Sequence, residues 1–479
     1  MSNSTGVKRV VVIGGGITGL AACHRLLAEA REQNLPLDVE LLEGSGRFGG
    51  TVETSREAGC LLEHGPDSFL SSKPAGLSLC KELGLGGEVM GTNPEQRRSF
   101  VLRGNSLLPI PPGFYMLAPS SFLPFLATPI FSPLGKLRMA LDLAIPRRRG
   151  GGDETLASFV RRRLGREALE RMAQPMVAGI YSADPEDLSL EATFPQFLEM
   201  ERAHRSILLA LRKRMATGGA EASASGPRYG LFVTLRRGMG SLVGALLGRI
   251  PEPALRRGCR ALFLRREAAR WRVAVEGRGE TQADAVCLAL PAWAAGRLLQ
   301  EVSPRMTASL RDIPYGSVGT LNLVFREEQL SRPLKGMGFV VPAVERRSLL
   351  ACSFSSVKFE GRAPEGKVLL RVFFAGPEEE TFALSDGRAA ERLLGELHAI
   401  LGVRGEPEAT LLRRYPRSMP QYRLGHLDRV RAIEEEAERL PGLALAGSAY
   451  RGVGIPDCIE GANRAAARLL DFLADASNG

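Results

Sequence analysis

The first fifty residues constrain the fold of this chain more than any other segment. Residues 9–13 have the β-branched density of a buried strand, and residues 37–42 form a second apolar run of strand composition. The glycine-rich segment 14–19 follows the first strand directly and leads into residues 20–31, whose composition favours a helix. A strand, a glycine-rich turn, a helix and a second strand in this order predict the βαβ unit of a doubly wound α/β domain.

The glycine-rich turn has the G-x-G-x-x-G spacing of a dinucleotide-binding site. Gly14 permits the tight turn, Gly16 lets the backbone approach a pyrophosphate, and Gly19 lets the helix pack closely on the strand. The unpaired N–H groups at the start of the helix favour an anionic ligand. Glu43, at the end of the second strand, is placed to accept hydrogen bonds from ribose hydroxyls. We expect the rest of the turn to contact the ligand as well, namely Gly15, Ile17 and Thr18.

Composition and charge exclude several classes of protein and of binding partner. The chain has 479 residues, enough for about three folded units, and 44% hydrophobic with 24% charged residues is typical of a globular protein. Seven widely spaced cysteines without a Cys-x-x-Cys pair predict reduced thiols in the cytoplasm, with neither a disulfide framework nor a metal site. The net charge is +10, but the arginines are scattered and aromatic residues make up only 6%, so we expect no nucleic-acid partner. A positive field still favours a small polyanionic ligand.

Apolar periodicity predicts the other elements of the chain. Helices are expected over residues 73–83, 155–164, 167–178, 197–215, 389–401 and 458–473. Strands are expected over 261–264, 271–276, 285–290, 320–325, 338–341, 349–354, 368–374, 409–415 and 443–447. Residues 216–227 are small, polar and rich in glycine, which predicts a loop.

The long apolar stretch 110–134 has two interpretations. Its six prolines cannot donate backbone hydrogen bonds, which argues against a single membrane-spanning helix. One interpretation is a set of loops and short helices packed over a pocket. The other is a patch that dips into one leaflet of a membrane, assisted by the arginines at 147–149 and 161–163.

The segment after the second strand resembles a flavoprotein motif. Residues 43–50, EGSGRFGG, match the E-x-x-x-R-x-G-G extension of flavoproteins of the amine oxidase, phytoene desaturase and glutathione reductase type. The resemblance implies that the dinucleotide is FAD. Arg47 would meet the pyrophosphate, and the glycine pair would let the chain pass close to the cofactor. The cofactor contacts expected here are Gly44, Arg47, Gly49, Gly50 and Thr51.

Five further motifs, in order along the chain, resemble signatures of the protoporphyrinogen/coproporphyrinogen oxidase family. They lie at residues 63–69 (EHGPDSF), 179–182 (GIYS), 204–206 (HRS), 419–426 (MPQYRLGH) and 452–458 (GVGIPDC). The resemblance implies an FAD-dependent six-electron oxidation of a porphyrinogen, with dioxygen as acceptor, in haem biosynthesis. The flavin would abstract hydride, so no catalytic acid or base is expected, and the five scattered histidines are expected to be structural.

The resemblance also implies a discontinuous domain layout. The Rossmann-like FAD-binding domain would comprise residues 7–50, 232–305 and 435–477. A mixed-sheet substrate domain would comprise 51–92, 180–231 and 306–434, and a helical insertion would cover the pocket from 93 to 179. Further cofactor contacts are then expected at Gly65, Pro66, Asp67, Ser68, Ala261, Tyr415, Gly447, Val453, Gly454 and Ile455.

Four residues are expected to face the substrate. Met337 and Val340 would form an aliphatic wall, for which an ordinary core role is the alternative, and Gly179 would leave room for the macrocycle. Ser99 stands where animal and plant protoporphyrinogen oxidases have an arginine, which favours the bacterial coproporphyrinogen III oxidase branch and a substrate with four carboxylates. A one-residue shift in the count would place Arg98 there instead.

Two other functions stay open on the sequence. An amine oxidase or carotenoid desaturase carries the same flavin motifs, although seven tyrosines and two tryptophans are few for the aromatic cage of an amine oxidase. A non-catalytic binder on the same fold, as in the GDP dissociation inhibitors, is the other. We expect a cytoplasmic protein, with peripheral contact at the inner face of the cell membrane and a homodimer both left open.

Overall fold

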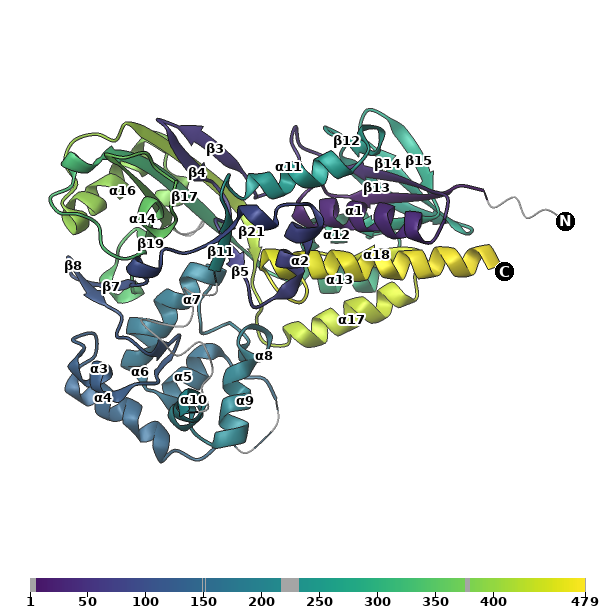
Figure 1. Ribbon diagram of the computed structural model, residues 1–479. Coiled ribbons are helices and arrows are strands. Elements are labelled where there is room, and N and C mark those ends of the chain that lie inside the picture. The colour runs from purple at the N-terminus through teal and green to yellow at the C-terminus, as the bar shows by residue number, and fades with distance from the viewer. Residues whose placement is uncertain (1–5, 149, 151, 217–231, 375–379, 479) are drawn as a thin grey trace.

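The computed structural model describes residues 6–148, 150, 152–216, 232–374 and 380–478. The loop predicted over 216–227 therefore lies, from residue 217 onward, outside the described residues. Figure 1 shows two strand-containing regions side by side and a helical region, from α3 to α10, below them.

The first sheet is parallel and joins segments that are far apart in the sequence. Its strand order is β12-β2-β1-β16-β22, and every pair of neighbours is parallel. The strands are β1 (Lys8–Ile13), β2 (Leu37–Leu42), β12 (Leu255–Arg256), β16 (Ala285–Leu288) and β22 (Leu443–Leu445). The predicted βαβ unit is confirmed, because α1 (Ile17–Glu32) connects β1 to β2.

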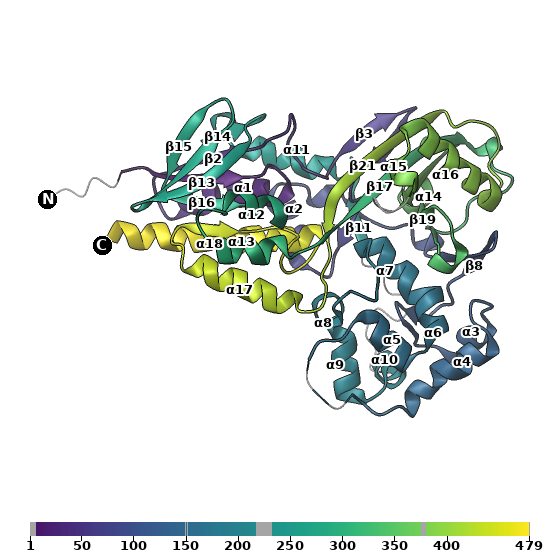
Figure 2. The same ribbon diagram turned by 180° about the vertical axis from the view of Figure 1, so that it is seen from behind.

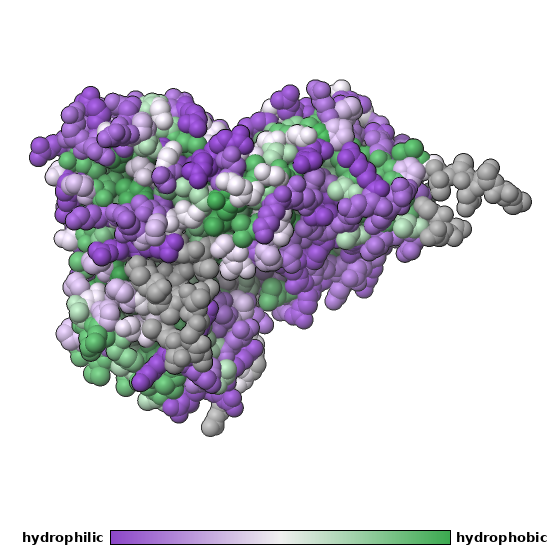
Figure 3. All heavy atoms as spheres, viewed as in Figure 1, coloured by the Kyte–Doolittle hydropathy of each residue, from purple (hydrophilic) through white to green (hydrophobic). Residues whose placement is uncertain are grey.

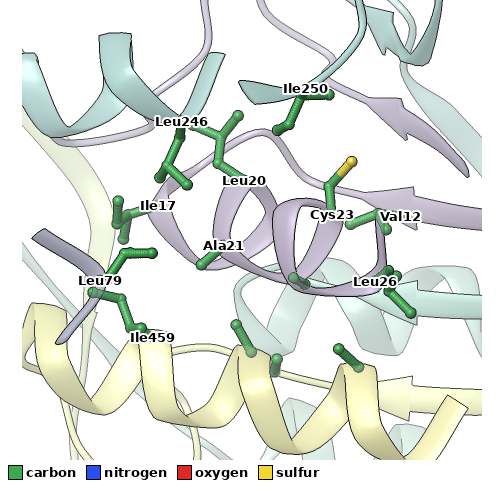
Figure 4. Close-up of a cluster of buried hydrophobic side chains, with 14 of the residues drawn as sticks. Val12, Ile17, Leu20, Ala21, Cys23, Leu26, Leu79, Leu246, Ile250 and Ile459 are labelled. Carbon is green, nitrogen blue, oxygen red and sulfur yellow. The ribbon is translucent and has the colours of Figure 1, made fainter. Parts of the chain in front are cut away.

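Helices α1 and α18 (Ile455–Asn478) pack against each other over this sheet. Figure 4 shows Leu20 and Ala21 of α1 between Ile459 of α18 and Leu246 of α11 (Gly240–Arg249). Since β1 and β22 are parallel strands of one sheet, the helices that follow them begin at the same edge. This edge is where a doubly wound domain binds its ligand.

The second sheet is mixed and has seven strands, in the order β21-β17-β20-β19-β18-β7-β8. Only the β18–β7 pair is parallel. Its strands are β7 (Phe100–Arg103), β8 (Ser106–Pro109), β17 (Tyr315–Arg326), β18 (Gly338–Val340), β19 (Leu349–Phe354), β20 (Lys367–Phe374) and β21 (Ala409–Pro420). Helix α16 (Asp386–Leu401) covers one face through a shared apolar core. The predicted mixed sheet is confirmed, although β17 and β21 are longer than the sequence predicts.

Smaller elements connect the two sheets. A three-stranded antiparallel sheet packs beside the first sheet, and two short sheets lie between the regions. These strands are β13 (Ala261–Glu267), β14 (Arg270–Val275), β15 (Gly279–Ala283), β3 (Thr54–Glu57), β4 (Cys60–Glu63), β5 (Phe69–Leu70), β6 (Val89–Gly91) and β11 (Phe232–Leu235). The accompanying helices are α2 (Pro74–Glu82), α12 (Ala292–Leu298), α13 (Pro304–Arg311), α14 (Ser355–Lys358), α15 (Glu380–Ala383) and α17 (His426–Glu438). Figure 2 shows α17 alongside α18.

The helical region has its own apolar core, which includes side chains of α5, α7, α9 and α10. Its elements are β9 (Phe114–Tyr115), β10 (Ala118–Pro119), α3 (Phe122–Ala127), α4 (Pro133–Ala140), α5 (Leu156–Arg163), α6 (Arg166–Ala168), α7 (Gln174–Tyr181), α8 (Leu190–Thr193), α9 (Pro195–His204) and α10 (Ile207–Ala216). The predicted helix 167–178 contains a π-helical turn, Leu169–Ala173. In the described part of the chain, no helix combines the length and the apolarity that a bilayer span requires.

The continuous helix predicted over 197–215 is wrong. The chain leaves the helix at Arg205, whose φ is +65°, so that α9 and α10 are separate. The cause is the buried Asp142, which accepts hydrogen bonds from the Ser206 hydroxyl and from the Leu208 N–H at 3.1 Å. Arg163 donates to the Arg205 carbonyl at 2.7 Å and fixes the turn from the other side.

Candidate functional site

In the turn between β1 and α1, Gly16 is the glycine at which an added Cβ would not clash with the protein. A Cβ on Gly19 would lie 1.8 Å from the Gly14 carbonyl oxygen, and one on Gly14 would lie 2.3 Å from that of Ala289. These two glycines are therefore required by the fold itself. At Gly16, where φ is −71°, the nearest heavy atom to an added Cβ is 3.9 Å away. This is an ordinary van der Waals distance, so the fold itself does not require glycine at this position, and the N–H groups at the start of α1 fit a pyrophosphate.

Glu43 and the segment 44–51 face this turn. The Glu43 carboxylate accepts hydrogen bonds from the N–H groups of Gly15 and Ser45, both at 2.7 Å. The Gly49 N–H donates to the Gly15 carbonyl at 2.8 Å. Arg47 donates to carbonyl groups of its own loop, including Gly50, and its side chain stays 43% exposed. The motif glycines thus bring the two loops into contact.

Ala261 lies close to the same end of the site. The chain leading to it runs beside Glu43, because the Cys259 N–H donates to the Glu43 carbonyl at 2.8 Å. A Cβ on Gly44 would also meet Arg260 at 3.4 Å.

The loop after β4, with Gly65, Pro66, Asp67 and Ser68, is held by the second sheet. Arg371 of β20 is buried and donates to the His64 carbonyl at 3.1 Å and to the Gly65 carbonyl. Thr320 of β17 also donates to the His64 carbonyl. A Cβ on Gly65 would lie 1.7 Å from the Thr51 carbonyl oxygen, so this loop also touches the flavin motif.

Asp67 anchors the far end of this loop. Its carboxylate accepts from Lys358 Nζ at 2.7 Å and from the Ser68 hydroxyl at 2.6 Å. Burial opposes ionisation of Asp67, but Lys358 and Arg371 outweigh burial and hold the pKa of its carboxyl well below the usual range. Asp67 is thus a carboxylate at neutral pH, fixed between two cations.

Several buried polar atoms around this loop have no hydrogen-bond partner within the described chain. They are His64 Nδ1, Asn322 Oδ1, Arg371 Nε and Tyr415 Oη. Asn322 and Arg371 are opposite each other on β17 and β20, and Tyr415 interacts electrostatically with Arg371 and Arg47. Burial raises the pKa of Tyr415 and lowers that of His64. Buried donors and acceptors normally have partners, so these atoms fit a polar ring system between the loops and the sheet.

The loop from β22 to α18 completes the edge. Gly447 has a φ of +136°, and Val453, Gly454 and Ile455 lead directly into α18. The Tyr422 hydroxyl donates to the Ser448 carbonyl at 2.6 Å and accepts from the Gly452 N–H at 2.9 Å. This single phenol therefore sets the shape of the loop.

A lysine from before α2 closes the start of α18. Lys73 Nζ lies 2.5 Å from the Asp457 carboxylate, which also accepts from the Gly454 N–H at 3.2 Å. Because Gly454 precedes α18 and Asp457 lies in its first turn, these contacts hold the start of that helix in place.

The four predicted substrate residues lie on or next to β7, β18 and α7. The Met337 N–H donates to the Arg98 carbonyl at 2.7 Å, and Val340 pairs with Val101, two residues after Ser99. Ser99 is buried, whereas Arg98 is exposed. Helix α7 contacts β18, and a Cβ on its Gly179 would have no neighbour within 4 Å.

Three residues that hold the predicted cofactor-binding loops were not predicted from the sequence, namely Lys73, Lys358 and Arg371. Arg371 carried a local signal, since it is the one charged residue inside the apolar run 368–374. Lys73 and Lys358 carried none, because their partners Asp457 and Asp67 are hundreds of residues away in the chain.

Comparison with known proteins gives one consistent result. Residues 17–470 match the family model described as flavin containing amine oxidoreductase. The coproporphyrinogen III oxidase of Bacillus subtilis is 35% identical over 98% of this chain and 99% of its own length. The protoporphyrinogen oxidase of Bos taurus is 32% identical over 97% of this chain and 98% of its length. A crystal structure from Exiguobacterium sp. 255-15, provisionally named a protoporphyrinogen oxidase, has a TM-score of 0.86 at 31% identity and covers 98% of this chain and 99% of its own.

Proposed function

Because the chain belongs to the flavin containing amine oxidoreductase family, we propose that it is an FAD enzyme that oxidises a porphyrinogen to the porphyrin. The observation that carries the proposal is the identity to porphyrinogen oxidases along almost the whole chain. The cofactor is FAD, and we propose that it is bound without a covalent link and that dioxygen is the final acceptor. The step removes six electrons from the macrocycle, and FAD supplies the redox chemistry when it is bound.

We propose that the protein holds FAD at the edge where α1 and α18 begin. The backbone at Gly16 would approach the pyrophosphate, and Glu43 would bind the ribose. The segments contributing contacts are 14–19, 43–51, 65–68, 261, 415, 447 and 453–455. The role of these residues is to bind, orient and exclude water, so that a meso carbon of the substrate is held against the flavin.

We keep the discontinuous FAD-binding domain as a proposal and adjust the limits of the helical insertion. All five strands of the first sheet come from the ranges 7–50, 232–305 and 435–477. Strands β7 and β8 belong to the second sheet, and α8 to α10 lie in the helical region. We therefore propose that the insertion extends from residue 110 to 216.

We propose coproporphyrinogen III as the preferred substrate, with Ser99, Gly179, Met337 and Val340 facing it. The test is the rate of reaction in air, followed by the increase in porphyrin fluorescence with coproporphyrinogen III or protoporphyrinogen IX, and by release of hydrogen peroxide with a primary amine as the alternative substrate. We expect the largest kcat/KM for coproporphyrinogen III. A preference for protoporphyrinogen IX would reject the substrate assignment, and turnover of the amine alone would favour an amine oxidase.

We also propose peripheral contact with a membrane through the stretch 110–134. The support is that Phe122, Leu123 and Leu126 of α3 are exposed, as is Leu134 of α4. Figure 3 shows apolar surface at the lower left, over the part of the helical region that holds α3 and α4 in Figure 1. Such a cluster of exposed apolar side chains marks an interaction surface.

A further inference from the structure

An open pocket of about 660 Å³ lies at the surface of the helical region, away from the candidate FAD site. One wall is the last turn of α9 and the residue after it, and the other is the chain that leaves α4. The lining residues are Pro146, Arg147, Arg202, Ala203, His204 and Arg205.

The charge of this pocket is not compensated by the protein. None of its lining residues is acidic. The side chains of Arg147, Arg202 and His204 have neither an ion pair nor a hydrogen bond within the described chain. Among the residues that the structure describes, the Arg205 side chain donates only to the Leu143 carbonyl, at 2.9 Å. Three arginines and no carboxylate thus line one pocket.

Neighbouring arginines behave differently. Arg162 pairs with Glu154 at 2.7 Å and with Glu201 at 2.6 Å, and Arg163 pairs with Asp142. The carboxylates of Glu154, Glu201 and Asp142 are therefore buried and already paired with other arginines. A helix C-terminus favours cations, which accounts for basic residues on α9 but not for Arg147, since it comes from another segment.

The turn at Arg205 is held by specific contacts. Arg205 has a φ of +65°, a backbone region that non-glycine residues rarely adopt. Buried contacts from Arg163 to the Arg205 carbonyl, and from Ser206 to Asp142, hold it there. The fold thus keeps the end of α9 opposite Arg147.

The pocket adjoins the exposed apolar surface. The Arg205–Leu143 hydrogen bond links the pocket to the short helix 141–143, in which Leu141 is 48% exposed. Leu137 and Leu134 of α4 continue this surface and are 61% and 78% exposed. Exposed leucines beside unpaired guanidinium groups match the two layers of a lipid surface, acyl chains and anionic phosphates.

We propose that this pocket binds the phosphate group of an anionic phospholipid when α3 and α4 rest on a membrane. Arg147, Arg202 and Arg205 donate to the phosphate oxygens, since guanidinium groups bind phosphate in a bidentate manner. The proposal rests on the membrane contact proposed above and is independent of the flavin reaction.

The test is co-sedimentation of the FAD-loaded full chain with vesicles of phosphatidylcholine, with and without phosphatidylglycerol. The pocket variant is Arg147→Ala with Arg202→Ala. The matched control is Arg332→Ala with Lys335→Ala, which removes the same charge at two exposed positions of the strand-rich region. We expect the pocket variant to lose affinity for phosphatidylglycerol vesicles by at least about tenfold and the control to stay near wild type. FAD content and porphyrin formation should be unchanged in both.

Equal losses in the two variants would overturn the proposal, because they would indicate only a general positive field. Leu123→Ser with Leu137→Ser tests the membrane contact separately, since it should weaken binding to both kinds of vesicle. Another outcome is that wild type binds inorganic phosphate but neither kind of vesicle, with the pocket variant failing to bind phosphate. In that case the pocket is an anion site, and the proposal that its ligand is a phospholipid is rejected. If wild type binds neither vesicle nor phosphate, the site itself is rejected.

Discussion

At the scale of single residues, substitutions of Gly16 and Gly19 allow the contributions of this turn to FAD binding and to folding to be measured separately. A Cβ at Gly16 would make only an ordinary contact, at 3.9 Å, so we expect Gly16→Val to fold with near-wild-type stability but to lose FAD. Gly19→Ala is the control, because its Cβ would meet backbone at 1.8 Å and should destabilise the apoprotein as well. Urea unfolding of the apoproteins and flavin absorbance of the purified proteins distinguish the two. Flavin retained by Gly16→Val would contradict the placement of the pyrophosphate.

The Asp67–Lys358 pair gives a second residue-scale prediction. Lys358→Met leaves a mostly buried carboxylate without its nearest cation, so we expect a loss of about 3 kcal/mol in the free energy of unfolding. Adding Asp67→Asn should recover part of it. Because the pKa of Asp67 is depressed in the folded state, its contribution is present above the unfolded pKa and is lost as the pH falls. Denaturant unfolding at neutral pH tests this, and an unaffected single variant would show that the pair does not anchor the loop.

Ser99 tests how the substrate is read. An arginine there would offer a propionate a charge-assisted pair worth about 1.5–3 kcal/mol, which Ser99 cannot form. We expect Ser99→Arg to shift the kcat/KM ratio toward protoporphyrinogen IX by about tenfold or more. Arg98→Ala, at the exposed neighbour, should leave the ratio unchanged. A shift caused by Arg98→Ala instead would show that the neighbouring residue faces the substrate.

At the scale of elements, the join between α17 and the loop before α18 depends on His426. It stacks on Tyr422 with 3.9 Å between ring centroids, and its Nε2 lies 2.9 Å from the Tyr450 carbonyl oxygen. Burial lowers the pKa of His426 to about 4. The unfolded chain binds a proton near pH 6.5 and the folded chain does not, so stability should fall between pH 6.5 and 4, by up to about 3 kcal/mol.

Unfolding followed across this pH range checks the assignment. His426→Gln should reduce the loss of unfolding free energy between pH 6.5 and 4. His398→Gln, at an exposed position, should show the same loss as wild type. If His426→Gln loses as much unfolding free energy as wild type over this pH range, other groups cause the loss of stability in acid.

The sequence predicts those elements that depend on residues close together in the chain. The βαβ unit was predicted because strand, glycines and helix follow each other directly. The break at Arg205 was missed, since it depends on Asp142, which is far away in the chain. Strands β17 and β21 extend past their predicted limits because each pairs with the other over most of its length, and pairing between distant segments leaves little trace in the pattern of either one.

At the scale of the whole molecule, the candidate site is assembled from segments that no local pattern connects. The motifs placed Gly14, Glu43 and Gly65 near the cofactor, and the fold brings their loops together. The cations that hold these loops come from the second sheet and α14, as Arg371 shows by bonding His64 across 307 residues. Such contacts follow from the tertiary structure, which is why the sequence predicted the loops but not their anchors.

We propose that this chain oxidises a porphyrinogen through FAD bound at the turn between β1 and α1. The most direct test is porphyrin fluorescence in air after coproporphyrinogen III is added to wild type and to Gly16→Val, each compared with autoxidation. We predict that wild type forms porphyrin well above the blank and that folded Gly16→Val, lacking FAD, stays at the blank. Wild type with full FAD occupancy and no porphyrin formation would contradict the claim.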